Sequence, residues 1–369
     1  MLIGVPKEIK DHEFRVGVTP AGVHALVAAG HEVHVQTSAG AAIGLSDADY
    51  ASAGAQIVAD AKAVYACPLI VKVKEPQPAE LAWLREDQVL FCYFHLAASL
   101  ELTQALRQKK IIAVAYETVT DGAGGLPLLI PMSEVAGRIA IQVGANALHM
   151  ANGGAGILLG GVPGVAPGKV LIIGAGTVGT QAARMALGLG ADVTLMDINL
   201  QRLRYLDDVF GPRLKTRYSE AHAIAELTRE ADLVVSSISL PGKRAPKLVT
   251  REMVRSMKRG AVLVDVAIDQ GGSAETSRPT THTDPTYIEE GVVHYCVTNM
   301  PAACARSATD ALTHASLAFL LKLAQGPQAT LRDHPGLRSG MQLYRGQVTH
   351  AGLAEDLGLP DASAESLLA

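Results

Sequence analysis

The sequence has no long apolar run, no cluster of basic residues and only four cysteines among its 369 residues. No stretch approaches the ~20 apolar residues of a membrane span, because Gly, Pro or a charged residue interrupts the longest candidates. The net charge of −4 comes without a basic run, which argues against binding to nucleic acid or to an acidic membrane surface. We therefore expect neither a nucleic acid nor a membrane as partner.

The cysteines are too scattered for a metal or redox motif. None forms a C-x-x-C pair, and they stand at Cys67, Cys92, Cys296 and Cys304. This pattern predicts four reduced thiols in a cytoplasmic protein, with no catalytic cysteine and no metal site. The first ten residues, MLIGVPKEIK, lack the charged and apolar segments of a signal peptide, which fits the same location.

Apolar residues are plentiful, at 49% of the chain against 18% charged residues, which is enough to fill two cores. At about 150 residues per domain, the length also predicts two domains. In the first third, apolar runs that predict strands alternate with patterns that predict helices. Strands are expected at 2–5, 31–35, 69–73, 89–94 and 111–115, and helices at 20–29 and 99–109, with Ser99 as N-cap.

A long amphipathic helix is predicted over 132–150, from apolar residues four apart, and a turn-rich connector over 153–168. A second series of strands follows at 170–173, 193–196, 233–236, 262–266 and 292–297. A helix is expected over 307–323, and residues 325–369 have the composition of a helical tail. Alternating strands and helices predict an α/β protein with two doubly wound, Rossmann-like domains built on parallel sheets.

The segment VLIIGAGTVG combines a strand, a tight turn and the start of a helix. It fits G-x-G-x-x-G, in which the glycines permit the turn, let the backbone approach a pyrophosphate and let helix and strand pack closely. These glycines are Gly174, Gly176 and Gly179. The N–H groups of Thr177 and Val178 then face the phosphates at the positive end of the helix dipole. We predict a dinucleotide site here.

Asp197 favours NAD over NADP as the dinucleotide. It ends the next strand, 23 residues after Gly174, close to the spacing of about 20 that places a carboxylate on the ribose diol. A carboxylate there repels a 2′-phosphate, whereas Arg202 nearby weakens that preference slightly. Because ligands lie beyond the carboxyl ends of parallel strands, further cofactor contacts are expected at the ends of the neighbouring strands. These positions are Ile238, Ser239, Val266, Ala267, Ile268, Asp269, Val297, Thr298, Asn299 and Met300, with the Asn299 amide suited to the nicotinamide carboxamide.

Four polar residues stand in unexpectedly apolar surroundings: Arg15, Lys74, His95 and Asp269. An Arg and a Lys at strand ends can clamp a small carboxylate, and a His can exchange a proton near neutral pH. Each also has a plainer interpretation. Arg15 can pair with a surface acid, Lys74 can be a solvated strand end, His95 can be a core histidine, and Asp269 can cap a loop. Together, split between two domains with a cleft between them, they suit a dehydrogenase of an oxo acid.

The chain resembles the alanine dehydrogenase family over nearly its whole length. The similarity rests on long motifs in the family's order: GVPKEIKDHEFRVGVTP, VKVKEP, LFCYFHLA, PMSEVAGRIA, VLIIGAGTVG, LMDIN, LPGKRAPKLVT, VDVAIDQGG, ETSRPTTH and TNMP. The resemblance implies the reversible conversion of L-alanine, NAD and water to pyruvate, ammonium and NADH. It further implies a homohexamer and an active site in the interdomain cleft.

The resemblance also implies a role for each site residue. Arg15 and Lys74 hold the substrate, His95 is the acid/base at the substrate oxygen, and Asp269 orients water or ammonia. Cofactor contacts carry over to Ser133, Thr177, Val178, Asp197, Arg202, Ser219, Ile268 and Asn299. The implied domain order is discontinuous: residues 1–130 and 306–369 form the substrate domain, and residues 131–305 the NAD domain, linked by long helices. Three residues depart from the family's usual pattern, namely Ala302, Cys304 and His314, and we expect them to alter cofactor affinity or domain closure only slightly.

The main alternative is the NAD(H)-binding component of a proton-translocating transhydrogenase, which resembles the same family but has no amino-acid substrate. It usually has a longer insertion where this chain has only residues 218–232, and a Glu where this chain has Asp269. A non-catalytic protein of this fold does not need all four polar residues. A dehydrogenase that condenses lysine with oxoglutarate needs a larger substrate site.

Overall fold

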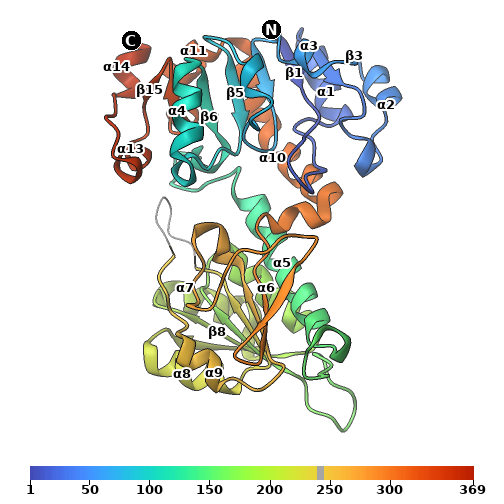
Figure 1. Ribbon diagram of the computed structural model, residues 1–369, viewed down its shortest axis with the longest axis vertical. Helices are drawn as coiled ribbons and strands as arrows, with labels where there is room; N and C mark the ends of the chain where they lie inside the picture. Colours follow the sequence, from blue (N-terminus) through green and yellow to red (C-terminus); the bar gives the residue numbers. More distant parts are fainter. Residues whose placement is uncertain (239–244) are drawn as a thin grey trace. The chain divides into compact units, whose positions relative to one another are not determined.

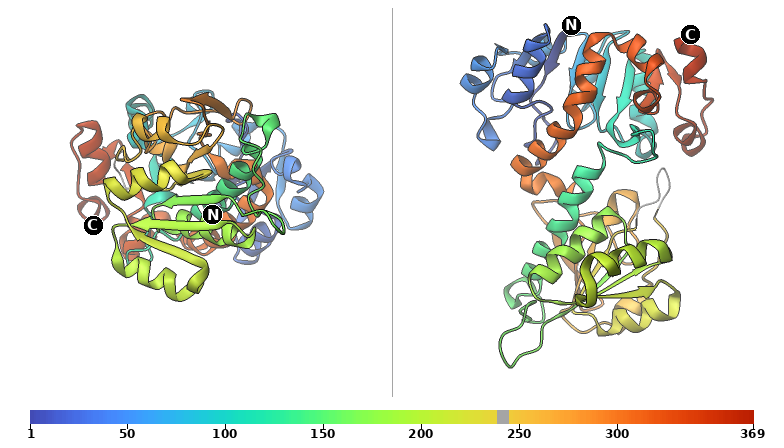
Figure 2. Two further views of the ribbon diagram at one scale, coloured as in Figure 1. Left: turned by 90° about the horizontal axis from the view of Figure 1, so that it is seen from below. Right: turned by 180° about the vertical axis from the view of Figure 1, so that it is seen from behind.

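The computed structural model describes residues 1–238 and 245–369 and divides the chain into two compact units (Figure 1). The first unit comprises Met1–Met132 and Cys304–Ala369, and the second comprises Ser133–Ala303. Each unit is built on one twisted sheet with helices against it (Figure 2). The prediction of two Rossmann-like α/β domains is thus confirmed.

The sheet of the first unit has the strand order β15-β14-β6-β5-β4-β1-β2-β3. Six strands are parallel: β1 (Leu2–Val5), β2 (Glu32–Gln36), β3 (Gln56–Val58), β4 (Leu69–Val71), β5 (Val89–Cys92) and β6 (Ile112–Ala115). β14 (Met341–Tyr344) pairs antiparallel with β6, and β15 (Gln347–Val348) pairs antiparallel with β14. The helical tail predicted over residues 325–369 is therefore wrong in its middle part, which extends the sheet, whereas helices precede and follow these two strands as predicted.

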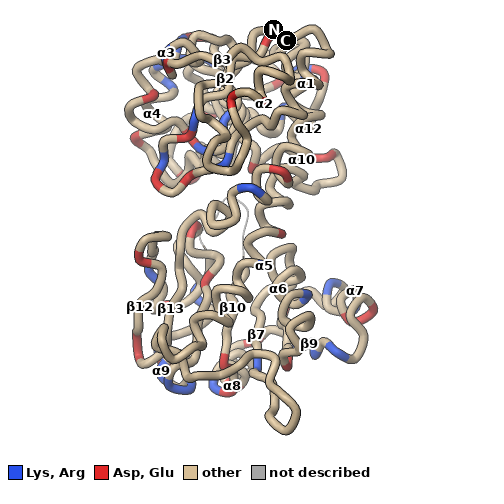
Figure 3. The backbone as a smooth tube through the Cα atoms, turned by 90° about the vertical axis from the view of Figure 1, so that its right-hand side faces the viewer, with Lys and Arg blue, Asp and Glu red and all other residues tan. Residues whose placement is uncertain are grey.

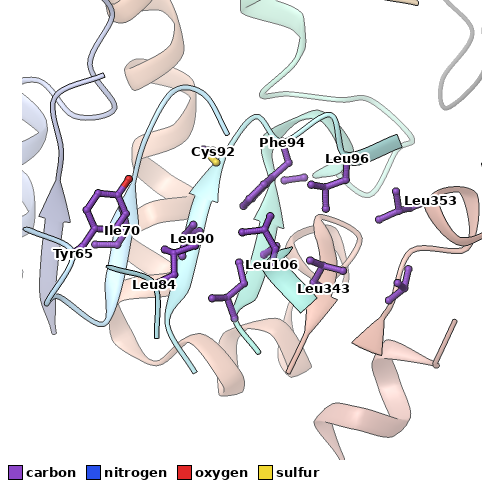
Figure 4. Packing of buried hydrophobic residues seen from close by; sticks show 14 of the residues in the cluster. Tyr65, Ile70, Leu84, Leu90, Cys92, Phe94, Leu96, Leu106, Leu343 and Leu353 are labelled. Atoms are coloured by element: carbon purple, nitrogen blue, oxygen red, sulfur yellow. The ribbon is translucent and has the colours of Figure 1, made fainter. Parts of the chain in front are cut away.

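Helices complete the first unit: α1 (Pro20–Ala28), α2 (Asp47–Ser52), α3 (Ala61–Val64), α4 (Leu100–Gln108), α10 (Ala305–Gln325), α11 (Pro327–Asp333), α12 (Pro335–Arg338), α13 (Ala351–Leu357) and α14 (Ala364–Leu368). The side chain of Ser99 accepts the N–H of Leu102, so the predicted N-cap of α4 is confirmed. One core cluster joins Leu90 and Phe94 to Leu343 and Leu353 (Figure 4). The C-terminal segment thus fills part of the core beside β5 and β6.

The sheet of the second unit has the order β12-β13-β11-β10-β7-β8-β9. Its strands are β7 (Lys169–Ile173), β8 (Asp192–Asp197), β9 (Leu214–Tyr218), β10 (Leu233–Ser236), β11 (Val262–Asp265), β12 (Thr286–Glu289) and β13 (Val292–Tyr295), and only β12 is antiparallel to its neighbour. The helices are α5 (Ile130–Ala147), α6 (Thr177–Gly188), α7 (Leu200–Phe210), α8 (Ala221–Glu230) and α9 (Arg251–Ser256). The apolar runs predicted the five central strands, whereas β9 and β12 at the edges, like β3 in the first unit, were missed.

In the part of the chain that the structure describes, acidic and basic residues are interspersed along both units (Figure 3). Among the described residues, no helix is long and apolar enough to cross a bilayer. All four cysteines are free, with Cys304 the only one that is not buried. No group of three or more metal-ligating side chains occurs within residues 1–238 and 245–369.

Candidate active site

The glycine turn after β7 has the geometry that its motif predicts. Gly174 has φ +106°, a backbone conformation that residues with a side chain rarely adopt. A Cβ on Gly179 would lie 1.8 Å from the carbonyl oxygen of Gly174, so only glycine permits this close packing of α6 on the turn. A Cβ on Gly176 meets nothing within 4 Å, so the backbone there is open to a ligand. The sequence motif predicted the same roles for these glycines: the tight turn, the open approach to a pyrophosphate and the close packing of helix and strand.

The N-terminus of α6 is not capped by a side chain of its N-cap residue, Gly176. Its first N–H groups, those of Thr177 and Val178, are thus placed at the positive end of the helix, where a pyrophosphate binds favourably. α5 crosses this turn closely, since a Cβ on Gly137 would lie 2.2 Å from the carbonyl oxygen of Val178. Ser133 lies one helical turn before Gly137 on the same face of α5, and so on the side that packs against α6.

Two glycine substitutions in α6 separate close packing from helix propensity. We expect Gly179→Ala to lower the melting temperature and weaken NADH binding, because its Cβ collides with backbone that cannot move aside. Gly188→Ala is the matched control in the same helix: its Cβ meets nothing within 4 Å, and alanine favours the helix by up to about 1 kcal/mol. Differential scanning fluorimetry and NADH titration measure both. Equal behaviour of the two variants contradicts the assignment of Gly179.

Asp197, at the end of β8, lies directly against the glycine turn. One carboxylate oxygen accepts the N–H of Ala175 at 2.6 Å, and the other accepts the N–H of Asn199 at 2.8 Å. A carboxylate has about four acceptor sites, so these bonds fix its position and leave capacity for a ribose diol. The backbone N–H of Ser219 donates to the carbonyl of Asp197 at 3.0 Å, which brings the end of β9 beside it.

Arg202 also binds the turn. Its Nε donates to the carbonyl of Ala175 at 2.8 Å, its guanidinium reaches the Thr180 hydroxyl at 2.8 Å, and it stacks on the ring of Tyr205. The residue expected to weaken the preference for NAD is thus held on the same turn as Asp197. Sequence reasoning placed both residues near the ribose but gave no indication of these contacts.

The residues after β10 and β11 lie at the same carboxyl ends of the parallel strands as the glycine turn. The Ser237 hydroxyl donates to the carbonyls of Ile173 and Gly174, and Ile238 lies close to Gly174, while Ser239 is outside the described residues. After β11, residues 266–270 form a 3-10 helix that includes Val266, Ala267 and Ile268. Asp269 is exposed on it, and Asp265 is its N-cap. The N-cap of this 3-10 helix is therefore Asp265 and not Asp269.

Asp265 is fully buried and shapes the loop that presents Asp269. Its carboxylate accepts the N–H groups of Ala267 at 3.1 Å and Ser273 at 2.7 Å. It also accepts the N–H of Ala274 and the hydroxyl of Ser277. A buried carboxylate with this many donors fixes the loop backbone. Nothing in the sequence distinguished it from the other acidic residues.

The segment after β13 continues along the same edge. Val297 and Met300 are buried, whereas Thr298 and Asn299 are partly exposed. Asn299 has φ +60°, a left-handed conformation that Asn tolerates better than most residues. Of the departures from the family pattern, Ala302 is buried in the next 3-10 helix, Cys304 precedes α10, and His314 is exposed on α10.

In the first unit, Arg15 is only 2% exposed and is paired with Glu13. Its Nε and one terminal nitrogen donate to the two carboxylate oxygens at 2.7 and 2.6 Å, and its other terminal nitrogen contacts the sulfur of Met132 at 3.0 Å. Burial opposes the charge, but the hydrogen bonds and charge of Glu13 outweigh it, so the pKa of Arg15 is raised. The expected pairing of Arg15 with a surface acid is wrong, because Glu13 is buried too.

Lys72 and Lys74 follow the end of β4, which stops at Val71. Lys72 is buried between Glu8 and Glu80, at 3.2 and 2.9 Å. Glu8 also accepts the backbone N–H groups of Val73 and Lys74, and burial raises its pKa. Lys74 is only 7% exposed and is therefore not a solvated strand end. The two lysines look equivalent in sequence, and only the fold separates them.

His95 follows β5, which ends at Cys92, and its side chain is 47% exposed. The interpretation as a core histidine is therefore wrong. Its ring stacks on Tyr93 at 6.0 Å, and the backbone has φ +49°. Glu117 accepts the N–H of His95 at 2.6 Å, and its carboxylate lies 4.0 Å from the imidazole Nδ1. Sequence reasoning missed Glu117, because it lies 22 residues from His95.

Comparison with known proteins identifies the family of this chain. The N-terminal domain model of alanine dehydrogenase/PNT matches residues 4–136, and the C-terminal domain model of the same family matches residues 140–351. This chain belongs to the alanine dehydrogenase/PNT family. The resemblance inferred from the sequence motifs is thereby confirmed.

Members of the alanine dehydrogenase/PNT family match along the whole chain. The alanine dehydrogenase of Halomonas elongata is 54% identical over 370 residues, covering 100% of both chains, and that of Bacillus subtilis is 53% identical, covering 100% of this chain and 98% of its own. A solved L-alanine dehydrogenase superposes with a TM-score of 0.94 at 49% identity, over 97% of this chain and 99% of the other. A transhydrogenase from Sinorhizobium meliloti gives 0.80 at 24% identity, over 95% and 99%, and shows the shared fold alone.

Proposed function

We propose that this protein is an NAD-dependent L-alanine dehydrogenase, an enzyme that converts L-alanine, NAD and water reversibly to pyruvate, ammonium and NADH. The observation that carries the proposal is the full-length similarity to alanine dehydrogenases at 54% and 53% identity. The buried cations and the exposed histidine of the first unit agree with it. So does the dinucleotide turn of the second.

The second unit fits NAD. Gly176 leaves the space that a pyrophosphate needs, and Asp197 stands 2.6 Å from the turn with acceptor capacity for a ribose. When bound, NAD accepts a hydride from the substrate. The residues of this unit bind and orient it: Ser133, Gly174, Gly176, Thr177, Val178, Gly179, Asp197, Arg202, Ser219, Ile238, Ser239, Val266, Ala267, Ile268, Val297, Thr298, Asn299 and Met300.

The remaining site residues act on the substrate. Arg15 and Lys74 hold its carboxylate and carbonyl oxygen, and the buried position of both makes these interactions strong. During alanine oxidation His95 takes a proton from the oxygen that water contributes to the product carbonyl, and it returns a proton to that oxygen in the reverse reaction. Asp269, exposed on its 3-10 helix, orients the water or ammonia.

A single assay tests the proposal against its alternative. Purified protein is mixed with NAD and L-alanine, and separately with NADH, pyruvate and ammonium, while absorbance of NADH is followed. We expect NADH to form in the first mixture and to disappear in the second. A protein that binds NADH but shows neither reaction behaves as the NAD(H)-binding component of a transhydrogenase, and the proposal is then wrong.

Asp197 is expected to select NAD over NADP. Asp197→Ala removes the charge that repels a 2′-phosphate, so the ratio of kcat/KM for NAD to that for NADP should fall by about tenfold or more, equivalent to roughly 1.4 kcal/mol. Loss of the bond to Ala175 also weakens NAD binding itself. Asp192→Ala is the control, since it removes a carboxylate from the opposite end of β8. An unchanged ratio contradicts the ribose assignment.

A homo-oligomer, with the hexamer as the expected state, is part of the proposal. Residues 150–168 contain no charged residue. They include a hairpin closed by Val162 and Val165, which lies in the green loop that extends from the second unit at the bottom of Figure 1. Both valines are exposed, as are Met150, Leu158 and the neighbouring Leu189. Exposed apolar surface of this extent favours self-association. Light scattering of the purified protein measures its mass in solution. The mass of a monomer would contradict the proposed homo-oligomer.

A further inference from the structure

The backbone of the loop that contains His95 is hydrogen-bonded to the side chain of Glu117. This residue lies in the short 3-10 helix Tyr116–Thr118, directly after β6, and its side chain is only 11% exposed. Its two carboxylate oxygens accept the N–H of Phe94 at 3.1 and 3.3 Å, and one of them accepts the N–H of His95 at 2.6 Å. The carboxylate thus satisfies the backbone where the chain leaves β5 and turns into a left-handed residue.

The imidazole of His95 lies near the same carboxylate. Nδ1 is the ring nitrogen nearer to Glu117, at 4.0 Å from its Oε1. The ring lies flat against Tyr93, with an angle of 5° between the two planes. Tyr93 is itself fixed, because its hydroxyl donates to the carbonyl of Leu128. One ring nitrogen therefore faces a carboxylate, and the other is directed away from it.

The charge of Glu117 also acts on the C-terminal part of the unit. Burial lowers the pKa of His350, and Glu117 is the main charge that opposes this change. Nδ1 of His350 accepts the N–H of Leu353 at 3.2 Å and so caps α13. Leu353 packs in the same core as Leu96, which follows His95 directly. An effect of Glu117 on catalysis through this C-terminal contact must therefore be separated from a direct effect on His95.

We propose that Glu117 is a positioning residue for His95. It fixes the backbone of the loop and keeps the proton of the neutral imidazole on Nδ1, so that the lone pair of Nε2 is available to the substrate. During alanine oxidation a proton passes to Nε2 from the oxygen that water contributes to the product carbonyl. The imidazolium that results then faces the carboxylate through its Nδ1–H. This inference rests on the proposed function, because it assumes that His95 is the acid/base.

Two substitutions of Glu117 test the proposal. Glu117→Gln keeps one acceptor oxygen and removes the charge, whereas Glu117→Ala removes both. We expect kcat for alanine oxidation to fall by about 10- to 100-fold in the alanine variant, the range typical of losing a partner that orients a histidine, with a smaller loss in the glutamine variant. The Kd for NADH, measured by fluorescence titration, should stay within about twofold of the wild type.

Nitrogen-15 NMR of histidine-labelled protein gives a readout that does not depend on activity. The signals of His95 are assigned by their loss in His95→Asn, and they show which ring nitrogen carries the proton. We expect Nδ1–H in the wild type and a declining share of it in the glutamine and alanine variants. Wild-type kcat together with a wild-type nitrogen pattern in Glu117→Gln overturns the proposal, even if Glu117→Ala does not fold.

Two control variants separate the contact with His95 from indirect effects of Glu117. Glu101→Gln changes an exposed carboxylate in the first turn of α4 and should alter neither readout. His350→Asn keeps a capping side chain on α13 but removes the group that faces Glu117. If His350→Asn reproduces the loss of kcat, Glu117 acts through the C-terminal segment and the proposal is wrong. If the wild type does not oxidise alanine, the proposed function fails, while the nitrogen pattern still tests the contact.

Discussion

His95→Asn is expected to lower kcat for alanine oxidation by about 10²- to 10⁴-fold, the range for loss of a general acid/base. Asparagine is the appropriate replacement, because it tolerates the left-handed backbone of His95 at φ +49° and so leaves the loop intact. NADH affinity should change by less than about twofold, since no cofactor residue of the second unit is altered. Steady-state kinetics and NADH titration measure the two quantities.

The control for this substitution is His24→Asn, which replaces an exposed histidine on α1 and should leave both quantities unchanged. If His95→Asn retains wild-type turnover, another group moves the proton and the assignment of His95 is wrong. If NADH affinity collapses as well, His95 supports the structure and not the chemistry.

Arg15→Met should have a second large effect, on stability as well as on activity. Removing one partner of a buried ion pair costs about 3–5 kcal/mol, because the remaining charge stays buried and loses the interaction that offset its desolvation. Here the remaining group is the carboxylate of Glu13, which holds two nitrogens of Arg15 at 2.7 and 2.6 Å. The KM for alanine should also rise strongly. Trp83, the only tryptophan, lies in the first unit and reports its unfolding in denaturant by fluorescence.

The double variant Glu13→Gln with Arg15→Met separates the two effects. Replacing both charges of a buried pair is often nearly neutral, so the unfolding midpoint should return most of the way to the wild type. Alanine oxidation should remain impaired, because the group that holds the carboxylate is still absent. Recovery of activity together with stability would show that Arg15 is only structural. An unchanged midpoint in the single variant would show that the buried pair contributes little.

Local patterns predicted the parts of the fold in which local interactions decide the structure. The central strands are continuous apolar runs, because both faces of a parallel sheet are covered. The glycine turn is a local steric requirement, and Gly174, Gly176 and Gly179 satisfy it from three nearby positions. The short edge strands lack such a signal. β14 was missed because its position depends on pairing with β6, more than 200 residues earlier in the chain.

The candidate site also has features that the sequence predicted and features that only the structure shows. The NAD turn and the residue types suited to an oxo acid were evident from the sequence alone, together with family membership from its motifs. The partners of those residues were not. Glu13, Glu8 and Glu117 look like any other acidic residues in the sequence, and each is buried or nearly so against a cation, a backbone amide or an imidazole.

The sequence by itself determined the dinucleotide turn, because its requirements are steric and lie within a few residues. Only the tertiary structure decided which charges are paired and which side chains remain accessible. In the folded structure Lys72 lies between two carboxylates, and Arg15 is buried with Glu13. His95 remains exposed, with Glu117 beside it. The physical reason is that the free energy of a charge depends on its solvation and its neighbours, which the fold sets. The spacing of residues along the chain does not determine this solvation or these neighbours.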